Sequence, residues 1–471
     1  MGSGYGCERR LARRRAEGCS RFSDPPLRSS HGTAAACDQL MSDPVVVIGG
    51  GLAGLAAAAR LAKLGHRVEL YERSETLGGT WAPYRLASGV TVDDAPSIIG
   101  FPAPWRDLFR KSGRPLEAEL ARMGYALGPA LPATMIFADG AELTLPTDRG
   151  GQYATLAAAY GGSVAGRWRA LLDRLDAVWQ TLRGLGMEAE LRSRRQLSRS
   201  VSRTLFGHRM TLADLATSID HDHLGALIRS VAYRSGSVPE LTPAFAAVEL
   251  ALQRTFGRWE VLPLDTDSGL DVGRSSILIE ALAARLELRK VRVHLGCPVE
   301  CIELRDGHVT AVLTSDGDRP AASVIATCDP WQTFNDLLPV IADRQTRRRL
   351  HKLSPAAAPT ITHHEAPEPG AVLQETVALG EAGIPTVNYV GQLAGNRLRT
   401  THDFKATLPK PSYGAAWSGF ASWLRRPSVT TKIPGLYTAS PASPAGPGAS
   451  QVVLSAALAA YSCHDHLKAK A

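Results

Sequence analysis

The chain has little that would anchor it in a membrane or brace it with disulfides. No apolar run among its 471 residues reaches the roughly 18 needed to span a bilayer. Its seven cysteines are odd in number and include no C-x-x-C spacing, which argues against a disulfide framework or a zinc site and favours a reducing cytoplasm. The runs His221–His223 and Cys463–His466 lack further ligands at usual spacing, so we expect no metal.

The chain carries a modest excess of positive charge. The formal net charge is +8, with 44% apolar and 21% charged residues, which indicates a globular chain with a sizeable core. Residues 1–40 contribute +3 and the other 431 residues +5, a balance typical of a solvated surface, so no nucleic-acid partner is expected. Residues 1–40 lack periodicity and are predicted to be disordered or a non-native extension, because Met41 stands just before the first strand pattern.

A glycine-rich turn links two predicted strands near the start of the folded part. Val45–Ile48 is a continuous apolar run typical of a buried parallel strand, and Gly49–Gly54 is a tight turn. Leu55–Leu64 predicts an Ala-rich helix, and Arg67–Tyr71 predicts a second strand. This order is that of a Rossmann-type βαβ unit, which binds a dinucleotide.

Each motif residue has a physical task. Gly49 allows the sharp turn, Gly51 lets a pyrophosphate approach the backbone, and Gly54 lets the helix pack close to the sheet. The helix N-terminus offers free N–H groups to phosphate. Glu72, 23 positions after Gly49, can accept hydrogen bonds from ribose hydroxyls and would repel a 2′-phosphate, which argues against NADP.

The rest of the chain alternates between helical and α/β patterns. The middle is mostly helical, with an amphipathic period from Trp168 to Leu185. After about residue 272 the patterns predict a helix, a strand, a hairpin around Asp306-Gly307 and a buried strand. The expected elements are Met210–Ala216, Leu224–Tyr233, Glu249–Phe256, Ile277–Leu286, Val291–Leu295, Val299–Leu304, Val309–Leu313, Ser323–Ala326, Gly435–Ala439 and Gln451–His464.

Four stretches resemble the phytoene desaturase-like branch of the FAD-dependent amine oxidase superfamily. They are Val45–Thr80 with its second diglycine Gly78-Gly79, Gly89–Pro96, the segments Leu278–Leu286, Val293–Val299 and Ala326–Pro330 taken together, and the turn Gly446–Gln451. The sequence departs from the family pattern at Thr80, Trp81, Ala95, Ser440, Pro444 and Ala445. Several of these departures lie where the resemblance places the flavin ring, so they bear on the substrate rather than on FAD.

The resemblance implies an α/β fold, with a Rossmann-type FAD-binding domain of the two-dinucleotide-binding-domain flavoproteins and an inserted, largely helical substrate domain. The FAD-binding domain takes segments 43–104, 266–341 and 431–471, and the substrate domain takes 105–265 and 342–430. FAD is the expected cofactor, and no catalytic side chain is assigned. The implied cofactor-binding residues are Gly49, Gly51, Leu52, Ala53, Gly54, Glu72, Arg73, Gly78, Gly79, Thr80, Val299, Gly448, Ala449, Ser450 and Gln451.

The resemblance also implies an activity. We expect an FAD-dependent oxidoreductase that transfers hydride from a C–H bond of a lipophilic small molecule to flavin N5. One alternative is an amine oxidase-like flavoenzyme acting on a polar amine, which an aromatic cage would favour, although aromatic residues make up only 6% of the chain. The other is a non-redox protein of the same fold that binds lipid or prenylated protein. The expected location is cytoplasmic, with peripheral membrane contact left open.

Three further groups of residues allow two interpretations each. Asp148–Tyr153 is either a turn with a helix cap or part of a substrate entrance. His363-His364, in a Pro-rich stretch, is expected at the surface rather than in catalysis. Tyr233, Arg254 and Arg258 could reach a pocket, although arginine on an amphipathic helix is usually solvated.

Overall fold

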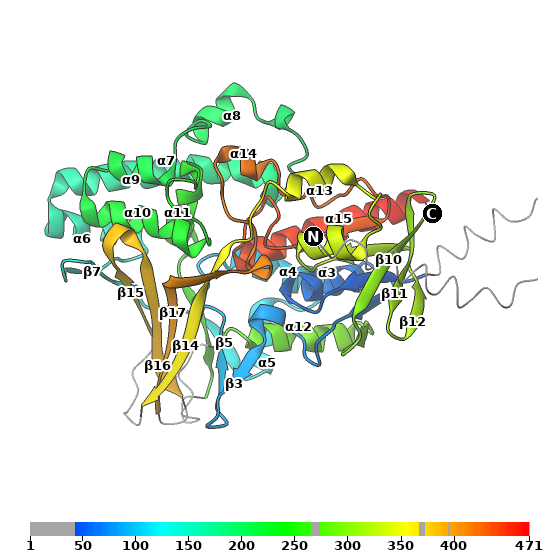
Figure 1. Cartoon of the computed structure of the whole chain (residues 1–471). Helices are drawn as coiled ribbons and strands as arrows, with labels where there is room; N and C mark the ends of the chain where they lie inside the picture. The colour runs from blue at the N-terminus through cyan, green and yellow to red at the C-terminus, as the bar shows by residue number, and fades with distance from the viewer. Residues whose placement is uncertain (1–42, 266–273, 367–372, 394–395, 471) are drawn as a thin grey trace, which may run out of the picture.

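A computed structural model describes residues 43–265, 274–366, 373–393 and 396–470. The prediction for residues 1–40 lies outside them. A parallel sheet with its helices occupies one side of the molecule and a helical lobe occupies the other. A long, mostly antiparallel sheet extends below that lobe (Figure 1).

The parallel sheet has five strands in the order β18-β13-β1-β2-β9, and every neighbouring pair runs parallel. Four of the strands are buried along their whole length, which explains their continuous apolar sequences. The strands are β1 (Val45–Ile48), β2 (Val68–Tyr71), β9 (Arg292–His294), β13 (Ser323–Ala326) and β18 (Leu436–Thr438). This sheet confirms the expected Rossmann-type α/β fold class.

Helices far apart in the sequence cover this sheet. Helix α3 (Leu52–Lys63) contacts α4 (Ala103–Ser112), α12 (Ile277–Leu288) and α15 (Ala449–Lys470). At their meeting point, buried Arg60 of α3 pairs with Asp107 of α4 at 2.7 Å and donates to the hydroxyl of Tyr461 of α15 at 3.1 Å. Helix α4 lies in the segment 105–265 expected to be the substrate lobe, yet Trp105, Leu108 and Phe109 join the core of α3.

The predicted hairpin around Asp306-Gly307 is confirmed. β10 (Val299–Arg305) pairs antiparallel with β11 (His308–Thr314), which pairs with β12 (Gly317–Pro320). Asp306 and Gly307 have φ values of +53° and +78°, the left-handed region that two-residue hairpin turns require.

The helical lobe contains α6 (Arg149–Tyr160), α7 (Gly162–Leu182), α8 (Arg199–Thr204), α9 (Leu212–Ser218), α10 (Asp222–Arg234) and α11 (Val248–Phe256). The residues of the amphipathic period in α7 are all buried in one core. Asp148 caps α6 by accepting a hydrogen bond from the Gly151 N–H at 2.7 Å, which confirms the helix-cap interpretation.

A six-stranded sheet in the order β14-β17-β16-β15-β6-β7 lies against the helical lobe. Its strands are β14 (Ala357–Ala366), β17 (Asn396–Pro409), β16 (Pro385–Leu393), β15 (Gln374–Leu379), β6 (Thr134–Ile136) and β7 (Glu142–Thr144). The Pro-rich stretch that holds His363-His364 therefore forms strand β14. The other elements are β3 (Pro83–Arg85), β4 (Thr91–Asp93), α5 (Leu116–Arg122), β5 (Tyr125–Pro129), β8 (Trp259–Pro263), α13 (Arg344–Leu350) and α14 (Phe420–Trp423).

Two structural facts concern the cysteines and the membrane. Cys297, Cys328 and Cys463 are free thiols, whereas Cys301 is disulfide-bonded, so the expectation of a chain without disulfides is wrong at Cys301. Within the described ranges, no helix combines the length and the apolar character that crossing a bilayer requires.

Candidate functional site

The glycine turn lies at the carboxyl edge of the parallel sheet, where strand β1 ends and helix α3 begins. Gly49 has a φ of +102°, and Gly51 is the N-cap of α3 without a side-chain capping bond, so backbone N–H groups at this helix end remain available. Thr327, just after β13, donates its hydroxyl to the Ile48 carbonyl at 2.8 Å and lies 3.1 Å from the Gly49 carbonyl. Thr327 therefore fixes the turn from a neighbouring strand.

Gly51 and Gly54 are glycines for different reasons. A Cβ atom on Gly54 would lie 1.9 Å from the Gly49 carbonyl oxygen, so internal packing alone requires glycine there. A Cβ on Gly51 would meet no atom closer than 4.0 Å, those being the Gly78 oxygen and the Gly79 Cα. The space beside Gly51 is thus open and faces the positive end of the α3 dipole, as a pyrophosphate requires.

Glu72 holds the turn from the end of β2. Its carboxylate accepts hydrogen bonds from the N–H groups of Gly50 at 2.6 Å and Ser74 at 2.8 Å, and the residue is only 9% exposed. The Gly78 N–H donates to the Gly50 carbonyl at 2.8 Å, which brings the second diglycine beside the first. We call the turn Gly49–Gly54, Glu72 and the diglycine Gly78-Gly79 together the cradle. Its residue Gly79 is exposed, and so are the neighbouring Arg73 and Thr80. The residues present therefore fit a dinucleotide.

The remaining predicted cofactor residues come from two other segments. Val299 begins β10, two residues after Cys297, whose N–H donates to the Glu72 carbonyl at 2.9 Å. Ala449 begins α15 immediately after exposed Gly448, and β18, which precedes this turn, is separated from β1 by a single strand. The N-termini of α3 and α15 thus both follow carboxyl ends of strands in one sheet.

The start of α15 connects this edge to the helical lobe. Ser450 donates its hydroxyl to the Phe101 carbonyl at 2.5 Å. Gln451 donates its side-chain N–H to Glu249 Oε1, in the first turn of α11, at 2.6 Å. Glu249 has no sequence signal for this contact, because a glutamate at a helix start is ordinarily a solvated residue that interacts favourably with the helix dipole.

Hydrogen bonds of Asp93 also connect β4 to the start of α12. Buried Asp93 accepts hydrogen bonds from the Ser276 N–H at 2.8 Å and the Ser275 hydroxyl at 3.3 Å, just where α12 begins. Asp93, from the stretch Gly89–Pro96 that carried part of the sequence resemblance, is therefore fixed to the residues that directly precede the stretch beginning at Leu278.

A polar row crosses the buried face of the six-stranded sheet. Glu375 of β15 lies opposite Tyr389 of β16, Tyr389 lies opposite Thr400 of β17, and Thr400 lies opposite His363 of β14. All four side chains are buried, and His363 hydrogen-bonds Thr400 at 3.0 Å. We call these four residues the polar row.

Charged groups close both ends of the polar row. At one end Glu375 pairs with Arg258, which is also buried, and with Arg234 at 3.4 Å. At the other end His363 lies 2.9 Å from Asp94, and this contact lowers the Asp94 pKa despite partial burial. The expectations that His363 lies at the surface and that Arg258 is solvated are therefore wrong, because tertiary pairing buries both. Arg254 instead pairs with Asp173 and Asp176 of α7.

Three titratable groups near the polar row have pKa values shifted by desolvation. Desolvation raises the pKa of Glu249 to about 7, although Arg234 and Gln451 act to lower it. Burial likewise raises the pKa of Glu260 to about 7, against the effect of Arg258. His402, next to Thr400 on the same face of β17, has its pKa lowered to about 4 by burial and then by Arg234.

An aromatic cluster lies nearby. Phe245 packs against Trp417, Phe420 and Trp423 with ring centroids 5.0 to 5.7 Å apart. The Trp417 N–H donates to the Ser237 hydroxyl at 2.8 Å, three residues beyond Arg234. Apolar rings and charged groups are thus linked through the segment from Arg234 to Ser237.

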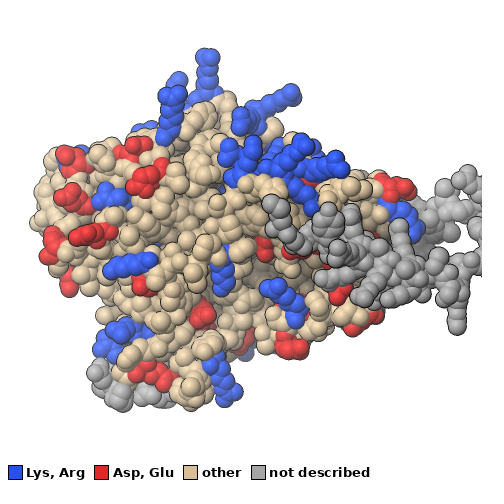
Figure 2. Space-filling view, viewed as in Figure 1, with Lys and Arg blue, Asp and Glu red and all other residues tan. Residues whose placement is uncertain are grey.

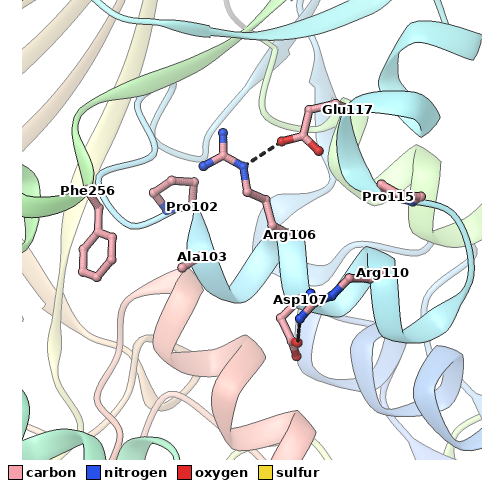
Figure 3. A pocket seen from close by; sticks show the side chains of 8 residues that line it. All are labelled: Pro102, Ala103, Arg106, Asp107, Arg110, Pro115, Glu117 and Phe256. Atoms are coloured by element: carbon pink, nitrogen blue, oxygen red, sulfur yellow. Dashed lines mark hydrogen bonds and ion pairs between the residues drawn. The ribbon is translucent and has the colours of Figure 1, made fainter.

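A surface pocket of about 300 Å³ lies apart from these groups (Figure 3). Its walls come mainly from α4 and the start of α5, and ion pairs join Arg106 to Glu117 and Arg110 to Asp107. None of the predicted cofactor residues lines this pocket.

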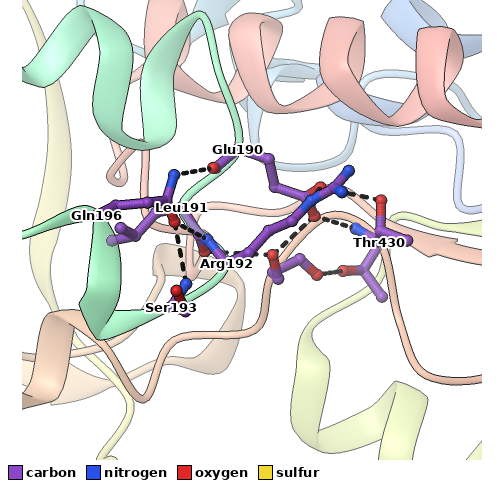
Figure 4. A network of polar contacts seen from close by, with 8 residues as sticks. Glu190, Leu191, Arg192, Ser193, Gln196 and Thr430 are labelled. Atoms are coloured by element: carbon purple, nitrogen blue, oxygen red, sulfur yellow. Dashed lines mark hydrogen bonds and ion pairs between the residues drawn. The ribbon is translucent and has the colours of Figure 1, made fainter.

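A polar network ties the helical lobe to the segment before β18 (Figure 4). The Glu190 carboxylate accepts hydrogen bonds from the Thr430 N–H, the Thr430 hydroxyl and the Ser428 hydroxyl, the last at 2.7 Å. Arg192 adds an ion pair with Glu190 at 2.6 Å. Glu190 therefore fastens the loop after α7 to the final segment of the parallel-sheet domain.

Comparison with known proteins gives one family match. The flavin containing amine oxidoreductase family matches residues 52–371, which is more than half of the chain. Phytoene dehydrogenase of Streptomyces griseus is 27% identical over 292 residues, covering 61% of this chain and 54% of that protein. Hydroxyneurosporene desaturase of Cereibacter sphaeroides is 29% identical over 295 residues, covering 61% and 56%. The matches thus span just over half the length of these relatives.

Solved structures share the fold. Cyclohexylamine oxidase of Brevibacterium oxydans superposes with a TM-score of 0.63 at 14% identity, covering 90% of this chain and 99% of that one. At this identity the likeness concerns the architecture alone.

Proposed function

Because the chain belongs to the flavin containing amine oxidoreductase family and resembles its phytoene desaturase-like branch, we propose that it is an FAD-dependent dehydrogenase of a lipophilic small molecule. The observation that carries this proposal is the cradle beside Gly51, where an open space, an uncapped helix start and a second diglycine meet. The names of the relatives, a phytoene dehydrogenase and a hydroxyneurosporene desaturase, favour a lipophilic substrate.

We assign the cofactor contacts to the segments that meet at the carboxyl edge. The turn Gly49–Gly54 holds the pyrophosphate, and Glu72 holds the ribose next to it. Val299 offers its backbone to the adenine, and the start of α15, Gly448–Gln451, faces the redox end. When bound, the flavin accepts hydride from a substrate C–H bond at N5.

The protein's own residues position the substrate and exclude water. The segments 105–265 and 342–430 supply the substrate side, where the aromatic cluster and the polar row lie. Gln451 connects the two sides, because it begins α15 and binds Glu249 of α11. No proton-transferring side chain is assigned to the dehydrogenation itself.

The first experiment is the absorbance spectrum of the purified protein, followed by identification of the flavin released on denaturation. We expect about one FAD per chain and bleaching of the flavin band when a lipophilic substrate is added without oxygen. A colourless protein that fails to take up added FAD would refute the oxidoreductase and favour a non-redox binding protein. A flavoprotein reduced only by polar amines would favour the amine oxidase-like alternative.

We also propose a peripheral contact with anionic membrane surfaces, from which a lipophilic substrate would be drawn. Lys and Arg side chains gather over α8 and α13 on the face seen in Figure 2. Exposed residues there include Arg199, Arg203, Arg344, Arg348 and Arg349. Ile341, just before α13, is 72% exposed and supplies an apolar contact beside these charges.

A further inference from the structure

Arg426 lies buried beside the turn 440–448, which leads into α15. It follows α14 and is 3% exposed. Its two terminal nitrogens donate to backbone carbonyls, to that of Ala415 at 2.7 Å and to that of Ser443 at 3.3 Å. The guanidinium carbon lies 4.0 Å from the centroid of the Trp417 ring. These contacts fix the side chain, and the bond to Ser443 places its charge directly at the turn.

No acidic group of the described chain balances the charge of Arg426. The other buried arginines Arg60, Arg258 and Arg285 each form an ion pair with an aspartate or a glutamate, whereas Arg426 forms none with a described residue. Its Nε atom and the hydroxyl of buried Ser443 also have no hydrogen-bond partner in the described ranges. A buried, unpaired charge is costly, so this arrangement calls for an anion from outside the chain.

Bracing of the turn alone does not explain an arginine here. A neutral N–H donor braces a backbone carbonyl as well, and the Trp423 indole does so by donating to the Pro444 carbonyl at 3.0 Å. The segment after α7 supports the same turn by packing, because a Cβ atom on Gly186 would lie 3.0 Å from the Pro444 Cβ. Arg426 differs from these contacts in carrying a charge.

The strand order indicates which part of FAD lies beside this charge. In the proposed binding mode the pyrophosphate lies at Gly51, after β1, and the ribose lies at Glu72, after β2. Strand β2 flanks β1 on one side, so the other half of the dinucleotide extends to the opposite side, where β13 and β18 lie. The turn 440–448 follows β18 and ends where α15 begins. Arg426 therefore belongs to the flavin half of the site rather than to the adenosine half.

We propose that Arg426 supplies the counter-charge for the flavin in its reduced form. This inference rests on the proposed function, because the anion belongs to the cofactor. The oxidised ring is neutral, and a hydride brings two electrons and one proton, so the reduced ring is an anion unless it takes up a second proton. A fixed positive charge, already in place before the reaction, favours that anion over the neutral oxidised ring and makes the flavin a stronger oxidant of its substrate.

The test is the midpoint potential of the flavin in the FAD-loaded full chain, measured by equilibration with a reference dye. Arg426→Gln keeps an N–H donor but removes the charge, and it should shift the equilibrium towards oxidised flavin by about tenfold or more, which lowers the potential by about 30 mV. Arg426→Lys keeps the charge and should stay within about threefold of the original equilibrium. The control Arg425→Gln removes the neighbouring, partly exposed arginine and should also stay within about threefold, because solvent screens that charge.

The pH dependence of the potential gives a second readout, which a bracing role would not change. An anionic reduced flavin takes up one proton with two electrons, so each pH unit should change the equilibrium about tenfold, or about 30 mV. Without the charge, Arg426→Gln should take up a second proton and approach about hundredfold, or about 60 mV, per pH unit. Arg426 itself stays protonated near pH 7, since burial lowers its pKa only to about 9 and no charged group of the described chain adds to that effect.

The outcomes separate this inference from the proposed function. Equal potentials of Arg426→Gln and the original protein, or equal losses in Arg426→Gln and Arg426→Lys, would overturn the counter-charge even in an active dehydrogenase. A flavoprotein that shows both expected shifts but oxidises no lipophilic substrate would keep the counter-charge and refute the dehydrogenase. A chain that takes up no FAD would overturn both. If Arg426→Gln does not fold, the original protein still decides, because a slope of about 60 mV per pH unit near pH 7 would contradict an anionic reduced flavin.

Discussion

Gly51 is a residue whose identity the protein's own packing does not explain. A methyl group there would meet nothing closer than 4.0 Å, and the backbone at φ −76° suits any residue. We therefore expect Gly51→Ala to leave the stability of the flavin-free chain within about 0.5 kcal/mol of the original. The same change should lower FAD affinity by about tenfold or more, because the pyrophosphate loses its close approach.

The measurement is FAD titration alongside urea unfolding of the flavin-free protein. Gly166→Ala is the matched control, since Gly166 lies within α7 with open space around it. It should gain up to about 1 kcal/mol of stability and keep full FAD affinity. Unchanged FAD binding in Gly51→Ala would place the pyrophosphate elsewhere.

His402 makes stability depend on pH through its burial. Its pKa is about 4 in the folded protein, against an ordinary value of 6.5. Between pH 6.5 and 4, this histidine is protonated in the unfolded chain but stays neutral in the folded chain. Lowering the pH through this range therefore stabilises the unfolded chain, and the free energy of unfolding should decrease by up to about 3 kcal/mol. The variant His402→Leu should lose that part of the decrease.

Urea unfolding at several pH values between 4 and 7.5 checks this prediction. His364→Leu, at an exposed position on β14, serves as the control and should keep the original pH dependence. Identical pH profiles for His402→Leu and the original protein would contradict a neutral, buried His402.

At the scale of the elements, Glu190 connects the loop after α7 to the segment before β18 through hydrogen bonds of its side chain. Its side chain is 8% exposed and accepts three hydrogen bonds from Ser428 and Thr430. We expect Glu190→Ala to destabilise the protein by about 2–4 kcal/mol, because three partly buried donors lose a charged acceptor. Glu188→Ala, which breaks only the exposed pair with Arg183, should cost less than about 1 kcal/mol.

Thermal and urea unfolding of the two variants provide the comparison. Equal stabilities of Glu190→Ala and Glu188→Ala would mean that the loop after α7 is held by apolar packing alone, without a contribution from its polar network.

Elements with strong local signals could be predicted from the sequence. The unit from β1 to β2 followed from an apolar run, a glycine turn and an Ala-rich helix, and the β10–β11 hairpin followed from Asp306-Gly307. Helix α7 followed from its amphipathic period. Strand β14 did not, because the prolines around it indicated a loop and its partner β17 lies some forty residues further along the chain.

The site was predictable to the extent that it is local. The cradle residues lie in one continuous stretch from Gly49 to Gly79, so their roles could be argued from spacing. The polar row could not be found in this way. Its members Glu375, Tyr389, Thr400 and His363 are aligned only by strand register, and each alone is an ordinary strand residue. The role of Glu249 could not be predicted for the same reason, because its hydrogen-bond partner Gln451 lies in α15, far along the chain.

At the scale of the whole molecule, the basic surface over α8 and α13 should bring the protein to anionic membranes. We expect co-sedimentation with vesicles of phosphatidylglycerol and phosphatidylcholine at low salt and release at high salt. Arg348→Glu with Arg349→Glu should weaken binding about tenfold or more, since each basic residue contributes about 1 kcal/mol at such a surface.

The control for this prediction makes an equal change of charge elsewhere. Arg110→Glu with Lys111→Glu alters two exposed residues of α4 and should reduce binding far less. Equal losses in both double variants would show that net charge, rather than this surface, governs attraction to the vesicles.

The strand order has a consequence for how the protein is made. β1 lies at the centre of its sheet, yet one of its two neighbours is β13, whose residue Ser323 pairs with Val45, and α15, which packs on α3, comes later still. At about 5–20 residues per second, a ribosome needs roughly 15–55 s between these partners. Throughout that interval the nascent β1 has an open edge and α3 an uncovered apolar side, which are the surfaces that chaperones shield and that aggregate when unshielded. Synthesis of this protein should therefore depend on chaperone supply far more than the stability of the finished fold suggests.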